Sequence, residues 1–250
     1  MKPKILVFDI ETAPNLVYTW GIWEQNVIKV VRSWYILCYS AKWLGEKSSV
    51  YALPDFKEYK NNPESDKEIC QKLRDLLDEA DVVIAHNGDK FDVRKSNARF
   101  IKHGIQPPSP YKTIDTLKVA RKYFNFDSNK LNDLGEYLGV GKKVETGGFE
   151  LWDKCMKGDK KAWSLMKKYN KQDVDLLEKI YFKLRPWMAT HPNMALFNEE
   201  EQVSCKKCGS FNHQKRGPVS SNSLWYQQYY CNDCGGWFRG DNSLGKSRPV

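Results

Sequence analysis

Two carboxylates near the amino end, Asp9 and Glu11, stand one residue apart in the stretch Phe-Asp-Ile-Glu-Thr. The apolar run 5–8 that precedes them is typical of a buried strand. Side chains two residues apart on a strand project to the same face, so both acids should point the same way. Carboxylates brought together on a buried strand lose hydration and repel each other, and a bound cation or a shared proton relieves that cost. The pair therefore predicts a site for a metal ion or a proton.

A tyrosine and a third acid, Tyr169 and Asp173, lie on a segment with helical periodicity. The segment 160–184 is expected to be one long helix or two abutting ones, because apolar residues recur three or four positions apart along it. Tyr169 and Asp173 fall in line with that apolar stripe, so the acid should face the interior, where an unpaired charge is costly. Pro186 should end the segment, since proline cannot continue the helical hydrogen bonding.

A fourth carboxylate, Asp92, follows an expected strand at 81–85 and a polar turn at 86–92. The helical spacing of 93–103, closed by Gly104, places Asp92 at a strand-to-helix junction. Open α/β sheets hold their ligands at the carboxyl ends of strands, which is where this acid would lie.

In type and order these residues resemble the motifs of the DEDD-type 3′–5′ exonucleases of the DnaQ-like group, in the subclass whose last motif carries tyrosine (DEDDy). Asp9 and Glu11 match the first motif, Asp92 the second, and Tyr169 with Asp173 the third. The resemblance implies a ribonuclease H-like fold of the α/β class, in which a mixed sheet is flanked by helices.

The resemblance covers residues 1–186 and includes two further family segments, 114–117 and 131–139. The chain departs from the family pattern at Gly88-Asp89-Lys90, where an extra charge pair leaves Asp89 as a rival for the role of Asp92. Other polar residues of this region have structural interpretations. His86 is expected to be a hydrogen-bonding residue of the turn and Asn87 to help position the Asp92 loop, whereas Asp115 and Asp133 are expected to be helix caps or structural acids.

The resemblance also implies a reaction. Phosphodiester bonds would be hydrolysed from a 3′ end, releasing nucleoside 5′-monophosphates, with two Mg²⁺ or Mn²⁺ ions about 3.5–4 Å apart. Carboxylate oxygens suit such hard ions. Asp9 would bridge the two ions, and Asp92 would support the second. Glu11 and Asp173 would complete the site that holds the nucleophilic water. Tyr169, neutral at pH 7 with a phenolic pKa of about 10, would orient that water.

The implied substrate is a single-stranded or frayed 3′ end, with DNA favoured over RNA, and a polymerase or another replication or repair protein is a candidate partner. Two alternatives remain open. One is a ribonuclease H-fold endonuclease or transposase-like protein, against which the pairing of Tyr169 with Asp173 argues. The other is a non-catalytic nucleic-acid-binding protein, which is disfavoured because no catalytic carboxylate is missing.

Two Cys-x-x-Cys pairs near the carboxyl end, Cys205 with Cys208 and Cys231 with Cys234, are separated by 22 residues. Four thiolates match the tetrahedral coordination of Zn²⁺, and so small a segment needs the metal to fold. The pattern resembles a zinc ribbon holding one structural Zn²⁺, with strands at 225–230 and 237–239. A pair of disulfides is the alternative, and it is disfavoured because nothing marks the chain as secreted. The other cysteines, Cys38, Cys70 and Cys155, are expected to be reduced core or half-buried residues.

Charge favours a polyanionic partner, since the formal net charge is +9 and the sequence pI is about 9.0. Candidate nucleic-acid contacts combine basic, polar and aromatic side chains: Thr12, Asn87, Lys206, Lys207, Arg216, Trp225 and Arg239, with Lys215, Tyr226 and Trp237 as further candidates. A rim of lysines leads into the third motif: Lys130, Lys142, Lys143, Lys154, Lys157, Lys160, Lys161, Lys167, Lys168 and Lys171. The alternative for the ribbon is docking on the nuclease domain or on a partner protein.

These observations predict a nuclease domain at 1–186, a linker at 187–203, the zinc ribbon at 204–240 and a flexible tail at 241–250. Within the first domain, strands at 34–44 and 48–53 should form a hairpin, and a capping box at 65–68 should open a helix. The aromatic residues of the insert 15–32, Trp20 and Trp23, are expected to be core or flap residues and not base-stacking platforms. With no signal peptide or membrane-spanning run expected, the protein should be cytoplasmic, in the host cytoplasm if a virus encodes it.

Overall fold

The structure, a computed structural model, describes residues 2–23, 26–143, 145–200 and 202–247. A five-stranded sheet has the order β5-β4-β1-β6-β7. Its strands are β1 (Ile5–Thr12), β4 (Ile36–Trp43), β5 (Ser49–Ala52), β6 (Val82–Ala85) and β7 (Lys112–Asp115). β1, β6 and β7 run parallel, whereas β4 is antiparallel to both β1 and β5. The expected strands and the 34–53 hairpin are thus confirmed within a residue or two at their ends.

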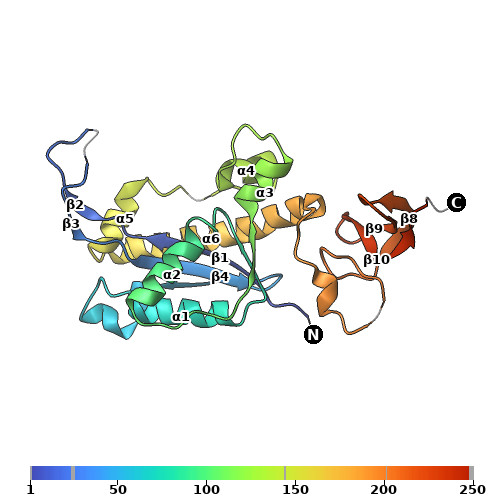
Figure 1. Ribbon diagram of the computed structural model, residues 1–250. Helices are drawn as coiled ribbons and strands as arrows, with labels where there is room; N and C mark the ends of the chain where they lie inside the picture. Colours follow the sequence, from blue (N-terminus) through green and yellow to red (C-terminus); the bar gives the residue numbers. More distant parts are fainter. Residues whose placement is uncertain (1, 24–25, 144, 201, 248–250) are drawn as a thin grey trace.

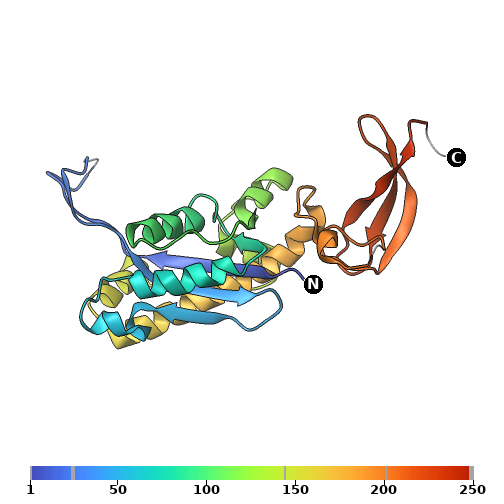
Figure 2. The same ribbon diagram turned by 60° about the horizontal axis from the view of Figure 1, so that its bottom comes forward.

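Six α-helices accompany this sheet in the described residues: α1 (Lys67–Asp78), α2 (Asp92–Lys102), α3 (Thr116–Tyr123), α4 (Leu131–Tyr137), α5 (Phe149–Met156) and α6 (Lys160–Leu184). Short 3-10 turns are η1 (Leu53–Asp55), η2 (Lys57–Lys60), η3 (Arg185–Trp187) and η4 (Met194–Phe197). α1 and α6 cover opposite faces of the sheet (Figure 2). The expected segment 160–184 is a single helix, and Pro186 lies in the 3-10 turn that follows it.

Alternation along β1 decides where the acids point. Leu6 and Phe8 belong to the core cluster that includes α1, whereas Ile5 and Val7 belong to the cluster that includes the second half of α6. Because side chains alternate along a strand, Asp9 and Glu11 continue the face of Ile5 and Val7. Full burial of one Leu, Ile, Val or Phe side chain contributes roughly 1.5–3 kcal/mol, so this alternation strongly fixes the register of β1.

The expected capping box at 65–68 is wrong. α1 begins at Lys67 after Asp66, whose side chain makes no capping hydrogen bond. The fully buried Asp66 carboxylate instead accepts hydrogen bonds from the Ile36 amide at 2.8 Å and from Arg99 Nε at 2.6 Å. Burial alone raises the pKa of Asp66, but these bonds and one with His103 hold it below its usual value. The Asp66 side chain binds the buried Arg99 guanidinium and not the helix amides. Local sequence does not reveal this partner.

The insert after β1 forms a separate two-stranded sheet, β2 (Leu16–Tyr18) with β3 (Lys29–Arg32). This hairpin projects from the end of the molecule opposite the carboxyl-terminal sheet (Figure 1). Trp20 is 89% exposed and Trp23 is 78% exposed. Of the two roles expected for these aromatics, core or flap, burial in the core is therefore wrong.

A three-stranded sheet at the carboxyl end has the order β10-β9-β8, formed by β8 (His213–Ser220), β9 (Trp225–Cys231) and β10 (Trp237–Gly245). The two expected strands are confirmed, but β10 runs on into the expected tail, where Ser243 pairs with Tyr226. The expected linker is partly packed. Met188 and Met194 are each 2% exposed and join the core over α6.

Candidate functional site

The acids of β1 and α6 meet in space. Ligand oxygens of Asp9, Glu11 and Asp173 all lie within 4.8 Å of one another. Asp92, the first residue of α2, is buried beside them and accepts a hydrogen bond from the Ile10 amide at 3.1 Å. Asp9 and Glu11 are half-buried, whereas Asp92 and Asp173 are almost fully buried. We call these four residues the acid cluster.

Burial and mutual repulsion make the acid cluster resist ionisation. Burial, followed by the charge of Asp173, raises the pKa of Glu11 to about 8. Burial raises the pKa of Asp92 to about 7, even though two backbone amides stabilise its anion. The pKa of Asp9 is raised well above its usual value by burial and then by the charge of Asp92. Such a group of acids can be fully ionised at neutral pH only with added positive charge nearby.

Two observations indicate that the cluster suits divalent ions. Asp173 Oδ1 is buried and has no hydrogen-bond partner among the described residues, so one ligand oxygen is left unsatisfied. The other oxygen, Oδ2, lies 2.5 Å from Lys143 Nζ, so a cation already occupies one side of the cluster. A donor set made of carboxylate oxygens fits hard ions such as Mg²⁺ or Mn²⁺.

Tyr169 lies at the edge of the acid cluster. Its side chain hydrogen-bonds the Asp173 carboxylate, and Lys143 Nζ donates to its hydroxyl at 3.2 Å. Burial and the Asp173 charge raise the pKa of Tyr169, so the phenol is neutral. The Trp152 ring packs edge-on to Tyr169 at 6.0 Å, and its side chain hydrogen-bonds Glu11. The phenol is therefore held in place and can donate or accept a hydrogen bond.

Sequence reasoning missed two residues of the site. Asn170 is fully buried, and its Nδ2 donates to Asp9 Oδ2 at 2.7 Å, which ties α6 to β1. The sequence did contain a signal for Asn170, because a polar residue three positions before Asp173 lies in line with an apolar helix stripe. Lys143 was expected only as part of the lysine rim, and it comes from a loop without periodicity. Other lysines of that rim bind acids: Lys154 with Glu150, Lys157 with Asp153, and Lys167 with Asp55.

The turn before α2 separates Asp89 from Asp92. Asp89 Oδ2 accepts a hydrogen bond from Lys118 Nζ at 2.6 Å, so its charge is paired outside the acid cluster. Asn87 has a φ of 66°, and a Cβ at Gly88 would lie 2.3 Å from the Cβ of Ala85. The tight turn therefore requires glycine there.

The neighbouring polar residues have the structural roles expected of them. His86 contacts Thr116 Oγ1 through Nδ1 and the Asn129 carbonyl through Nε2, both at 2.9 Å, and burial lowers its pKa. Asp115 caps α3 by accepting from the Leu117 and Lys118 amides. Asp133 lies within α4 and accepts from Ser128, so it is a structural acid.

The four carboxyl-terminal cysteines also converge, with all sulfurs within 4.8 Å of one another. Cys205 lies 3.6 Å from Cys234, and Cys208 lies 3.6 Å from Cys231. These separations are close to the roughly 3.8 Å edge of a tetrahedron with Zn–S bonds of about 2.3 Å. None of the seven cysteines, all of them within the described residues, forms a disulfide. Cys38, Cys70 and Cys155 are buried and reduced, as expected.

The candidate nucleic-acid contacts of the cysteine-rich unit differ in accessibility. Lys207 is only 8% exposed, and its ammonium donates to the Pro186 carbonyl after α6, so it is not available to a phosphate. Lys206 pairs with Asp241 at 2.5 Å. The Arg239 guanidinium stacks over the Tyr226 ring at 4.3 Å. The unit is therefore docked on the end of α6, with part of its basic surface engaged internally.

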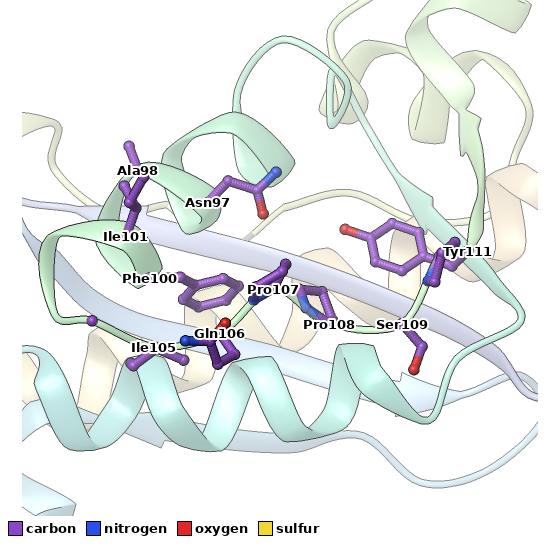
Figure 3. Close-up of a pocket in the computed structure, with 12 residues that line it drawn as sticks. Asn97, Ala98, Phe100, Ile101, Ile105, Gln106, Pro107, Pro108, Ser109 and Tyr111 are labelled. Carbon is purple, nitrogen blue, oxygen red and sulfur yellow. The ribbon is translucent and has the colours of Figure 1, made fainter.

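Two cavities lie near α2. One, of about 740 Å³, lies between α2 and the loop 104–111, and none of its lining residues carries a carboxylate, an imidazole or a thiol (Figure 3). The other, of about 570 Å³, adjoins the acid cluster, since both Thr12 and Trp152 line it. The helices of residues 2–23, 26–143, 145–200 and 202–247 include none with the length and hydrophobicity of a membrane span.

Comparisons with known proteins agree with this fold. A family model described as the RNase H superfamily matches residues 6–185. The DNA polymerase III PolC-type of Ureaplasma parvum serovar 3 is 25% identical over 199 residues, which make up 73% of this chain and 13% of that protein. The family B DNA polymerase from the archaeon Pyrobaculum calidifontis shares the fold, with a TM-score of 0.55 and 17% identity over 75% of this chain and 25% of that one. The chain thus spans a small part of each polymerase.

Proposed function

The chain belongs to the RNase H superfamily, and from that premise we propose that it is a metal-dependent 3′–5′ exonuclease of the DEDDy subclass, releasing nucleoside 5′-monophosphates. One observation carries the proposal above all: the oxygens of Asp9, Glu11 and Asp173 lie within 4.8 Å of one another, beside Asp92 and the Tyr169 hydroxyl. Four carboxylates and a neutral phenol are a costly arrangement for a purely structural site.

Each residue has a role that its position supports. We assign the four members of the acid cluster as ligands of two Mg²⁺ or Mn²⁺ ions, which when bound supply a nucleophilic water and neutralise the leaving oxyanion. The Tyr169 hydroxyl, which hydrogen-bonds the Asp173 carboxylate, positions the attacking water through a second hydrogen bond. Asn170 holds Asp9 against α6. Lys143 places a positive charge where phosphate oxygens would enter.

Two further features favour a nucleic-acid substrate, with DNA preferred. The PolC-type relative is a DNA polymerase, and the chain itself carries a net charge of +9. The cysteine cluster, with sulfur separations suited to tetrahedral coordination, would hold one structural Zn²⁺ and complete a ribbon that aids binding. A polymerase or another replication or repair protein is the corresponding partner.

The deciding experiment offers the purified protein matched 5′-labelled single-stranded DNA and RNA with Mg²⁺ or Mn²⁺. An exonuclease acting from the 3′ end gives a ladder of labelled products shortened one nucleotide at a time. Internal cuts without a ladder would instead identify an endonuclease. Asp9→Asn serves as the control, because cleavage that survives this change does not come from the acid cluster.

A further inference from the structure

The hairpin formed by β2 and β3 exposes an unusual amount of apolar surface. The most exposed large apolar side chains at its tip are Trp20 at 89%, Ile22 at 87%, Trp23 at 78% and Tyr18 at 61%. Val27 and Ile28, which precede β3, and Val30 and Val31 within it are each about half exposed. Contiguous apolar patches on a protein surface mark interaction sites, because water contact with them is unfavourable.

The root of the hairpin is fixed to the domain, so the tip is held away from the body (Figures 1 and 2). The Trp34 amide donates to Asn15 Oδ1 at 2.9 Å, and the Ala13 amide donates to the Tyr35 carbonyl at 2.9 Å. Arg32 forms an ion pair with Glu64 where β3 rejoins the domain. These bonds give the exposed tip a defined base.

The same root borders the acid cluster. The cavity of about 570 Å³ is lined by Thr12, Asn15, Trp34, Lys95 and Trp152, among others. The cavity therefore extends from Asn15, the first residue of the insert, to Trp152, which hydrogen-bonds Glu11. Lys95 Nζ lies 3.8 Å over the Trp34 ring in this cavity, which adds a positive charge beside a flat aromatic face. A ligand in the cavity would touch both regions.

The composition of the hairpin suits a partner that combines negative charge with flat bases. The insert 15–32 carries two cations, Lys29 and Arg32, and one acid, Glu24, so its formal charge is +1. Flat aromatic side chains beside cations are the combination that binds single-stranded nucleic acid, because bases of any sequence stack on such rings. A purely aliphatic patch would lack that complementarity.

We propose that the tip of this hairpin, through Trp20 and its neighbours, stacks on bases of a nucleic-acid strand whose 3′ end lies in the acid cluster. This inference rests on the proposed function. The eight residues from Asn15 to Ile22, with seven steps between them, span up to roughly 23 Å when extended. The tip therefore contacts nucleotides several positions away from the scissile bond, and it contributes grip on long strands without contacting the reacting atoms.

The test measures binding by fluorescence anisotropy, with a 5′-fluorescein 20-nucleotide single-stranded DNA, in an Asp9→Asn background without divalent ions. Trp20→Ala should weaken binding about 5- to 150-fold, the loss expected for one base stack. Trp20→Phe keeps a ring and should restore most of the affinity. Ile101→Ala is the matched control, since Ile101 is 80% exposed but lies on the last turn of α2. Unchanged binding by Trp20→Ala would overturn the proposal.

A second measurement separates the hairpin from the chemistry. The p-nitrophenyl ester of thymidine 5′-monophosphate is too small to reach the tip, so Trp20→Ala in the otherwise wild-type protein should hydrolyse it at the wild-type rate. If the wild-type protein hydrolyses neither the ester nor any oligonucleotide, the proposed function fails, whatever the anisotropy shows. Two outcomes with unchanged DNA affinity would overturn the inference. If Trp20→Ala abolishes a dimer, the tip contacts a second copy of the chain. If it abolishes binding to phosphatidylglycerol vesicles, the tip contacts a membrane.

Discussion

The acid cluster and the cysteine cluster each bring together four side chains suited to metal binding, but they lie in scaffolds of very different size. Around the acid cluster, two large groups of buried side chains pack on the faces of the five-stranded sheet. Around the cysteines, the buried group consists of Cys205, Cys231, Cys234 and Phe238, so most of that core is the ligand set itself. One scaffold can fold without its metal, whereas the other has little else to fold around.

This difference teaches what each metal would do. A preformed site that forces like charges together stores unfavourable electrostatic energy, which bound cations relieve. A small unit whose core is its ligands gains its folding free energy from the metal. Loss of metal should therefore abolish activity at the acid cluster while the surrounding domain stays folded. At the cysteine cluster, loss of metal should unfold the unit.

The largest expected effect concerns the cysteine cluster. Cys231→Ser should abolish binding of Zn²⁺ and unfold residues 204–245, because zinc contributes about 10–16 kcal/mol of apparent free energy in small zinc-binding units. Zinc content by mass spectrometry and amide dispersion in NMR spectra measure both effects. The five-stranded domain should stay folded. A well-dispersed ribbon spectrum in zinc-free Cys231→Ser would mean that the small core suffices alone.

The next effect concerns catalysis without unfolding. Asp9→Asn should lower kcat at least about 10³-fold, because in the proposed mechanism it removes charge from a metal ligand that stabilises the transition state. The melting temperature of the metal-free variant should equal or exceed that of the wild type, since repulsion in the acid cluster falls. Wild-type turnover in this variant would refute the site assignment. A much lower melting temperature would show that the acid cluster, like the cysteine cluster, is needed for folding.

The pH dependence of stability should separate the two regions further. The pKa of Glu11 rises from 4.5 to about 8 on folding and that of Asp92 from 3.8 to about 7, so the native state holds protons that the unfolded state releases. Stability is therefore highest below the unfolded values and falls, by on the order of a few kcal/mol, as pH rises from about 4 to about 8. Thermal unfolding between pH 5.5 and 8.5 should show this loss without Mg²⁺ and a smaller one with it. An identical pH profile in Asp9→Asn would contradict the explanation.

A smaller effect distinguishes the phenol from the ligands around it. Tyr169→Phe keeps the packing against Trp152 and removes only the hydroxyl. Turnover should fall by roughly 10- to 10³-fold, as for a lost positioning hydrogen bond. Mn²⁺ affinity measured by calorimetry should stay near the wild-type value. A large loss of Mn²⁺ affinity would make Tyr169 a ligand or a structural prop.

The smallest effect compares two lysines of the ribbon. Lys215 is exposed on β8, whereas Lys207 is buried against Pro186. If the ribbon grips phosphates, Lys215→Met should reduce the slope of log affinity against log salt by about 0.7, the value for one phosphate contact on a single strand. Lys207→Met should leave that slope unchanged. Equal slopes in wild type and Lys215→Met would favour a purely docking role for the ribbon.

Local patterns in the sequence were sufficient for much of this molecule. The alternation of β1 put Asp9 and Glu11 on one face, and the stripe of α6 put Tyr169 and Asp173 on another, because burial imposes a period of two on strands and 3.6 on helices. The paired cysteines likewise revealed their cluster, since metal geometry constrains ligand spacing. Each of these signals lies within a few residues of chain.

Only the tertiary structure decided which distant groups satisfy one another. Lys143, in a loop without periodicity, contacts Asp173. The side chain of Asp66, at the N-cap of α1, binds Arg99 and not the helix amides. Lys207, expected to contact a phosphate, donates to the Pro186 carbonyl. The exposure of Trp20 is of the same kind, because an aromatic residue is buried only if another element covers it, and none of the described elements does. The sequence by itself determined the faces and the ligand types, whereas long-range packing determined the partners, since a buried charge pairs with whatever the fold brings within reach.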